Sequence, residues 1–207
     1  NHRLLYIIKI GDMTPNRNPR VVVIGGGFAG LQFIRRLDQS VYDVLLIDKV
    51  NHHQFQPLFY QVATSQIEPA SISFPLRSIF YGSRSVQIRL TVVERIDTEA
   101  KKVYTGIGAF AYDYLVIAAG CKTNFFGNDK IAQHAFTLKS SVDAIQLRNH
   151  ILLTFERTIT APQDQKDFFQ TLVIVGASPT GVELAGAFAE IRKMILPKDY
   201  PRIDFSR

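Results

Sequence analysis

The amino-acid sequence predicts an α/β protein whose core is a parallel sheet covered by helices. Three observations point to this fold class. A buried strand rich in β-branched residues, a glycine-rich turn and a helix with apolar periodicity follow one another from Arg20 to Leu37. The same order of segments recurs from Thr171 to Ile191. Between these two regions, short apolar runs alternate with turn residues, as is typical of further strands.

Composition limits the kinds of protein that the chain can be. Its 207 residues could form one large domain or one and a half ordinary ones, and 46% of them are apolar. No apolar run reaches the ~18 residues that a bilayer-spanning helix needs. The net charge of +6 is spread along the chain, which argues against a nucleic-acid-binding arm but suits an anionic ligand or membrane surface. A single cysteine, Cys121, excludes an internal disulfide framework and fits a reducing compartment.

The first glycine-rich turn predicts a dinucleotide site. Gly25, Gly27 and Gly30 have the spacing G-x-G-x-x-G after the strand 21–24. These glycines permit a tight turn, close approach of a pyrophosphate to the backbone, and close packing of helix on strand. The N–H groups at the helix start, around Phe28 and Ala29, would face the phosphates.

An acidic residue completes the pattern. The next strand, 42–47, ends at Asp48, 18 residues beyond Gly30, where a carboxylate can accept hydrogen bonds from a ribose. The alternative interpretation is a glycine-rich turn in an α/β protein without a nucleotide.

The segment 51–64 is polar and aromatic, with a short helix predicted from Pro57. Adjacent side chains point in different directions on a helix or strand, so His52 and His53 are not expected to share a metal ion. We therefore predict no metal site. A loop packed on a bound cofactor and a solvated connection both stay open. One further short helix is expected within 68–85.

A β-meander is predicted from Val86 to Gly108, followed by a buried strand, 112–117, that ends in Ala118, Ala119 and Gly120. Together with the first turn, these segments predict one nucleotide-binding domain, 20–135, after an N-terminal extension, 1–19. Met13 is a plausible natural start within that extension.

The second domain is predicted to begin at residue 136 and to be incomplete at 207. A helix is expected from Ser141 to about Thr158, then a polar loop, 161–170, and a buried strand, 171–175. The second turn begins 151 residues after the first, and Ser178 replaces its middle glycine between Gly176 and Gly181. A Cβ at Ser178 limits the approach of a pyrophosphate, although its hydroxyl could hydrogen-bond to one.

Two such turns, with a meander and a YDYLVIAAG strand between them, resemble the two-dinucleotide-binding-domain flavoproteins. Within them, three segments are similar to type II NADH dehydrogenase, the single-subunit NADH:quinone oxidoreductase. These segments are VVVIGGGFAGL, NHHQFQPLFYQVATSQIEP and VIVGASPTGVELAGAFAEI. The resemblance covers about 20–207. It implies a Rossmann-like FAD-binding domain, made of a parallel sheet plus an inserted meander, and the start of a Rossmann-like NADH-binding domain.

The resemblance also implies roles for individual residues. Glu183 matches an acidic residue near the flavin and nicotinamide, which suggests proton handling; the other interpretation is that its charge suits the first turn of a helix. The remaining positions would bind cofactor. In the FAD site, Gly25, Gly27 and Gly30 would contact the pyrophosphate, Asp48 the ribose, and the backbone of Val93 the adenine, while Gln61 and Thr64 would lie near the flavin ring and Ala119 and Gly120 would close over the cofactor. In the NADH site, Gly176, Ser178 and Gly181 would form the turn that contacts NADH.

The implied activity is hydride transfer from NADH to FAD and electron delivery to a membrane quinone, without proton pumping, in a respiratory chain. The implied location is peripheral, at the cytoplasmic face of the inner or plasma membrane. Family members continue with the rest of the NADH domain and with membrane-binding helices, so the fragment alone is expected not to turn over NADH. A nucleic-acid partner is not expected, and a homodimer stays open.

Two alternatives remain. Sulfide:quinone oxidoreductase needs a pair of redox cysteines, of which Cys121 could be one; the chain could also be a non-catalytic nucleotide-binding remnant. Disulfide reductases fit less well, because no cysteine precedes Cys121.

Overall fold

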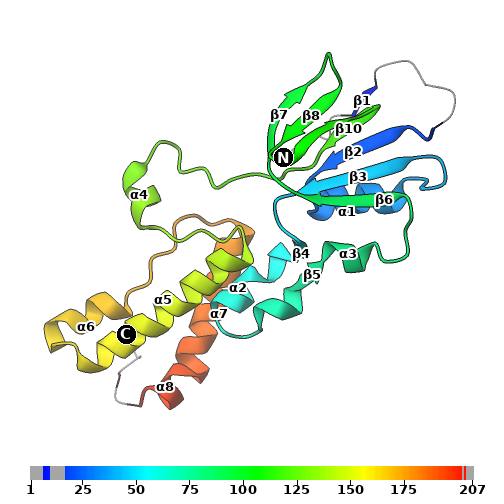
Figure 1. Ribbon diagram of the computed structural model, residues 1–207. Helices are drawn as coiled ribbons and strands as arrows, with labels where there is room; N and C mark the ends of the chain where they lie inside the picture. Colours follow the sequence, from blue (N-terminus) through cyan, green and yellow to red (C-terminus); the bar gives the residue numbers. More distant parts are fainter. Residues whose placement is uncertain (1–6, 10–16, 202, 204–207) are drawn as a thin grey trace. The chain divides into compact units, whose positions relative to one another are not determined.

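The computed structural model describes residues 7–9, 17–201 and 203 (Figure 1). The start predicted at Met13 lies outside these residues. The chain forms two compact units, of which the first comprises the described residues up to Gln54 and Phe74–Cys121, and the second Phe55–Ser73 with the described residues from Lys122 onward. The domain boundary expected after residue 135 stays a prediction. In the division into compact units, the chain enters the second unit, returns to the first, and leaves it again.

The core of the first unit is a five-stranded sheet with the order β1-β10-β2-β3-β6. Four strands are parallel, and β1 pairs with β10 in the antiparallel sense. The strands are β1 (Ile7–Lys9), β10 (Tyr114–Ile117), β2 (Arg20–Ile24), β3 (Asp43–Asp48) and β6 (Val86–Leu90). A parallel α/β sheet was predicted, and it is confirmed.

Alternate residues of the strands enter two separate cores, because successive side chains point to opposite faces. Val23 lies on the face covered by α1 (Phe28–Arg36) and α3 (Leu76–Ile79), where Ile34 is fully buried. Val22 lies on the opposite face and packs with Val103 of a second sheet. That sheet consists of β7 (Val93–Asp97), β8 (Lys102–Thr105) and β9 (Gly108–Ala111), drawn in green in Figure 1.

The β-meander begins one strand later in the chain than predicted. The prediction that it begins at Val86 is wrong, because β6 pairs in parallel with β3 and buries Ile88 beside Leu46 in the main core. The antiparallel sheet is completed instead by β9, in a segment where a turn was expected. An alternating apolar pattern predicts a strand but does not choose between two sheets that could each accept it.

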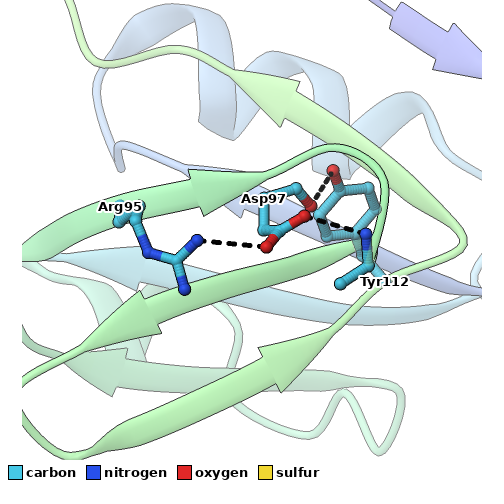
Figure 2. A network of polar contacts seen from close by, with 4 residues as sticks. Arg95, Asp97 and Tyr112 are labelled. Carbon is cyan, nitrogen blue, oxygen red and sulfur yellow. Dashed lines mark hydrogen bonds and ion pairs between the residues drawn. The ribbon is translucent and has the colours of Figure 1, made fainter.

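A polar network fixes the turn between β7 and β8 (Figure 2). The Asp97 carboxylate accepts hydrogen bonds from the backbone N–H of Ala100 at 2.8 Å and from the Arg95 guanidinium at 3.0 Å. These two contacts, in that order, lower the pKa of Asp97 below its ordinary 3.8. The Tyr112 hydroxyl donates to the Asp97 carbonyl at 3.4 Å. Burial, and then the Asp97 charge, raise the pKa of Tyr112.

The described part of the second unit is largely helical. Its core joins α2 (Phe59–Ala63), α5 (Ser141–Thr160) and α7 (Pro179–Met194) through Phe59, Ala144 and Leu184. The remaining helices are the 3-10 helices η1 (Gln56–Leu58) and η2 (Pro69–Ile72), and α4 (Asp129–His134), α6 (Gln163–Gln170) and α8 (Leu196–Asp199). Two short strands lie outside the two larger sheets: β4 (His52–Gln54) and β5 (Ser73–Pro75), which pair with each other.

Two local predictions for the second unit are wrong. The expected polar loop 161–170 contains helix α6, which begins directly after Pro162 and includes the good helix formers Gln163, Gln165 and Lys166. The segment 171–175 was expected to be a buried strand, but no strand is assigned there, and the side chains of Val173 and Val175 are 76% and 67% exposed. An apolar β-branched run becomes a strand only where a neighbouring strand accepts its backbone hydrogen bonds. None of the described helices is both long enough and apolar enough to cross a bilayer.

Candidate functional site

The turn after β2 lies where three parallel strands end. Gly25 has φ +105°, and its N–H donates to the carbonyl of Ile47 on β3 at 2.8 Å. A methyl group at Gly25 would overlap the carbonyl oxygen of Ala118, which follows β10. Both the positive φ and the contact with neighbouring backbone therefore require glycine at this position. Ligands of open parallel sheets bind at this carboxyl edge.

The other two glycines differ in what surrounds them. Gly30 is buried in α1, and a methyl group there would overlap the Gly25 carbonyl oxygen, so this glycine lets the helix pack against the turn. Gly27 is the exposed N-cap of α1, and a methyl group there would meet no atom within 4 Å. No side chain caps this helix start. Open space beside an uncapped helix N-terminus suits an anionic group such as a diphosphate.

Asp48 lies beside the turn, at the end of β3. Its Oδ2 accepts a hydrogen bond from the backbone N–H of Gly26 at 2.5 Å, and its Oδ1 accepts one from Val50 at 2.9 Å. A carboxylate has about four acceptor positions, so Asp48 can also accept hydrogen bonds from a ribose. The residues present therefore fit a dinucleotide, because glycines stand where a side chain would keep a ligand or neighbouring backbone away from the turn, and an acid stands at the end of β3.

Further predicted cofactor residues belong to this first unit. Ala119 and Gly120 are exposed directly after β10, and Gly120 has φ +74°. Val93 is half-buried at the start of β7. The chain that leads to it passes beside Asp48, since Thr91 N–H donates to the Asp48 carbonyl at 2.9 Å.

The predicted residues Gln61, Thr64 and Glu183 belong to the second unit. Thr64 is buried at the end of α2, with its hydroxyl donating to the Tyr60 carbonyl at 2.8 Å. Gln61 donates to the Tyr60 hydroxyl at 3.2 Å. Glu183 is exposed on α7, next to Leu184, which packs into the core that contains α2. Glu183 is the fifth residue of its helix, so it does not lie in the first turn as the helix-dipole interpretation requires. The roles of all three residues stay predictions.

The second turn repeats the geometry of the first. Gly176 has φ +103°, and a methyl group at Gly181 would overlap the Gly176 carbonyl oxygen. Val182 N–H donates to the carbonyl of Ser178 at 3.0 Å, and the equivalent bond joins Leu31 to Gly27 at 3.0 Å. Ser178 is the exposed N-cap of α7, and its hydroxyl makes no capping bond.

Sequence reasoning did not assign His53 to the site. Its side chain is buried, with Nδ1 3.2 Å from the Gly26 carbonyl oxygen, and its ring meets the Phe28 ring edge-on with centroids 4.8 Å apart. Within 7–9, 17–201 and 203, no group of three or more His, Cys, Asp or Glu side chains could hold a metal ion. The only signal in the sequence was the histidine doublet, which does not show which ring faces the turn.

Comparison with known proteins identifies the family. The model of the pyridine nucleotide-disulphide oxidoreductase family matches residues 19–199, most of the chain. The chain belongs to this family. Membership agrees with two glycine turns of equal geometry and with the parallel sheet of the first unit.

Several known proteins are similar to the chain. Type II NADH:quinone oxidoreductase Ndh of Mycobacterium tuberculosis is 38% identical over 93% of the chain and 43% of its own length. The external alternative NAD(P)H-ubiquinone oxidoreductase B3 of Arabidopsis thaliana is 31% identical over 93% of the chain and 36% of its own length. NDH2 of Plasmodium falciparum, solved in complex with NADH, superposes with a TM-score of 0.81 at 25% identity, over 90% of the chain and 40% of NDH2. The chain thus spans less than half the length of these relatives.

Proposed function

We propose that the protein containing this chain is a FAD-dependent oxidoreductase that passes electrons from NADH to a membrane quinone. The observation on which this depends is the first turn, where Gly25 and Gly30 permit close packing of backbone, Gly27 leaves open space at the start of α1, and the Asp48 carboxylate binds the turn through Gly26. Relatives named as NADH:quinone oxidoreductases support the choice of reaction.

The first unit would bind FAD. The amides at the start of α1, near Gly27, would surround the diphosphate; Asp48 would bind the ribose; and the backbone of Val93 would contact the adenine. Ala119 and Gly120 allow close approach because they have little or no side chain. When bound, the flavin supplies the capacity to accept a hydride and release electrons to a quinone.

The second unit would bind NADH at the turn of Gly176, Ser178 and Gly181, where the Ser178 hydroxyl can donate to a phosphate oxygen. Gln61 and Thr64 would border the flavin ring. Glu183 is an exposed carboxylate on α7, able to hold and release a proton at its carboxylate oxygens. The protein residues would therefore bind, orient and manage protons, while the cofactors perform the redox chemistry.

The same proposal locates the protein at the cytoplasmic face of the inner or plasma membrane, bound peripherally and without proton pumping. The net charge of +6 agrees with an anionic surface. Quinone is the proposed electron acceptor, and a homodimer is compatible with the proposal.

The proposal is tested with the full-length protein, in parallel with the 207-residue chain. Full-length protein should be yellow, release FAD on denaturation, and oxidise NADH only when a soluble quinone is added. The chain alone should not turn over NADH. Colourless full-length protein that cannot be reconstituted with FAD would support the alternative of a nucleotide-binding remnant.

A second candidate is sulfide:quinone oxidoreduction. Sulfide:quinone oxidoreductase of Aquifex aeolicus superposes with a TM-score of 0.59 at 26% identity, over 67% of the chain and 32% of that protein. Cys121 is exposed directly after Gly120. Quinone reduction that requires sulfide and is abolished by Cys121→Ser would favour this function; NADH-driven reduction unaffected by Cys121→Ser would exclude it.

A further inference from the structure

We propose that His53 is a positioning residue that orients the glycine turn for the cofactor diphosphate. The inference rests on the proposed binding of FAD at this turn. It begins from the contacts of Gly26, which lies between Gly25, with its positive φ, and the exposed Gly27. Gly26 is buried, and a methyl group there would lie 2.9 Å from the Leu76 side chain, so neighbouring atoms would have to shift to admit it.

Both polar groups of Gly26 are bound by side chains. Its N–H donates to Asp48 Oδ2 at 2.5 Å, and its carbonyl oxygen lies 3.2 Å from His53 Nδ1. A carbonyl oxygen can only accept, so His53 must carry a proton on Nδ1. The two side chains thus hold this residue from opposite ends of its backbone.

Peptide planarity transmits this contact to the next residue. The carbonyl of Gly26 and the N–H of Gly27 belong to one peptide unit, and no described peptide bond is cis. In a trans unit the C=O and N–H point in opposite directions. By holding the Gly26 carbonyl, His53 therefore turns the Gly27 N–H away from the imidazole ring. Gly27 is also the one glycine of the turn at which a methyl group would meet no atom within 4 Å.

The ring of His53 also touches the residue on the other side of Gly27. Phe28 begins α1, and its ring meets the imidazole edge-on at 4.8 Å. His53 thus contacts the residues before and after Gly27 without occupying the space beside it. If the plane of the Gly26–Gly27 peptide could turn freely, the affinity for FAD would fall, because a ligand binds only the fraction of molecules in which the N–H is correctly aimed.

The test uses substitutions that differ in where they place a donor. In the full-length protein, His53→Asn puts an amide N–H near the position of Nδ1, His53→Gln puts it about one bond further out, and His53→Phe keeps the ring without a donor. We expect His53→Phe and His53→Gln to weaken FAD binding to apoprotein about fivefold, the value of one ordinary hydrogen bond, and His53→Asn to restore most of it.

His52→Phe is the matched control. His52 is the neighbouring histidine, and its Nε2 lies 2.8 Å from Gln54 Nε2 and not at the turn. FAD affinity is measured by quenching of flavin fluorescence, and the ³¹P resonances of bound FAD report the surroundings of the diphosphate. His53→Phe should shift those resonances, and His52→Phe should leave them unchanged. Thermal unfolding of each apoprotein separates loss of fold from loss of binding.

The outcomes distinguish failure of this inference from failure of the proposed function on which it rests. Wild-type protein that binds no FAD contradicts the proposed function and removes the basis of the inference. Wild-type protein that binds FAD, with equal affinity and ³¹P spectra in the three His53 variants, overturns the inference alone. If His53→Phe does not fold, the comparison of Asn with Gln decides, and Gln binding as well as Asn overturns the role of Nδ1.

Discussion

The Asp48 carboxylate accepts a hydrogen bond from the backbone N–H of Gly26 at 2.5 Å. Asp48, at the end of β3, therefore holds the turn in place, in addition to the ribose contact that we propose for it. Stability and cofactor affinity should accordingly depend on the same side chain.

Asp48→Asn should lower both quantities. The amide has one acceptor oxygen, so its NH2 group must face one of the two backbone N–H groups that Asp48 now binds. We expect the free energy of unfolding of the apoprotein to fall by about 1 to 3 kcal/mol, and FAD affinity to fall at least about tenfold. Urea unfolding and fluorescence titration measure these. Asp38→Asn removes the same charge at an exposed turn and should change neither; a matching loss in Asp38→Asn would show a net-charge effect.

Gly25→Ala and Gly27→Ala should separate fold from ligand binding. Gly25 has φ +105° and no space for a methyl group, so Gly25→Ala should destabilise the apoprotein by about 2 kcal/mol or more. Gly27 has φ −76° and open space, so Gly27→Ala should cost less than about 1 kcal/mol. Gly27→Ala should nevertheless weaken FAD binding about tenfold or more. Unchanged FAD affinity in Gly27→Ala would mean that no phosphate approaches this residue.

Tyr200 should lose its proton at a higher pH than an ordinary tyrosine. Burial, and then the hydrogen bond to Glu156 Oε1 at 2.9 Å, raise its pKa from 10.0 to about 12. Because the folded pKa exceeds the unfolded one, the stabilising effect is complete below pH 10.0 and is lost as the pH rises toward about 12. Absorbance at the tyrosinate band should show a group titrating near pH 12 that Tyr200→Phe removes, while the raised pKa of Tyr112 is left in place. Glu156→Gln should lower this pKa only partly, since burial is the larger cause; a full return to 10.0 would contradict that order.

Asp97 should contribute stability that acid removes. Its pKa is lowered from 3.8 by the Ala100 N–H and by Arg95, so its contribution is present above about pH 4 and lost as the pH falls through the lowered pKa. Asp97→Asn should therefore reduce the fall in unfolding free energy between pH 4 and 2, measured by urea unfolding. Carboxylate NMR should report the lowered pKa directly. An unshifted resonance in the wild type would contradict the contacts shown in Figure 2.

The parts of the fold that depend on local patterns could be predicted from the sequence. The β-branched run before Gly25 and the glycine spacing specify strand, turn and helix within one short segment, and Asp48 follows from the length of the next strand. Other features depend on distant partners. Ile88 joins the main sheet only because Leu46 lies beside it, and Val173 is in no strand because no described strand pairs with it.

The site was predictable to the same extent. Gly176 and Gly181 adopt the geometry that their spacing indicates, even though Ser178 departs from the pattern. The contact of His53 with Gly26 could not be predicted, because a histidine 27 positions away in the chain has no local signature of its hydrogen-bond partner.

The course of the chain through its two units has a consequence for synthesis on the ribosome. Helix α2 emerges early, but the helices that bury Phe59 and Val62, α5 and α7, are translated only after the whole return through the first unit. At cellular translation rates this leaves the apolar face of α2 uncovered for seconds. Chaperone binding to nascent chains should therefore be strongest in that interval and should end once α7 has been released from the exit tunnel.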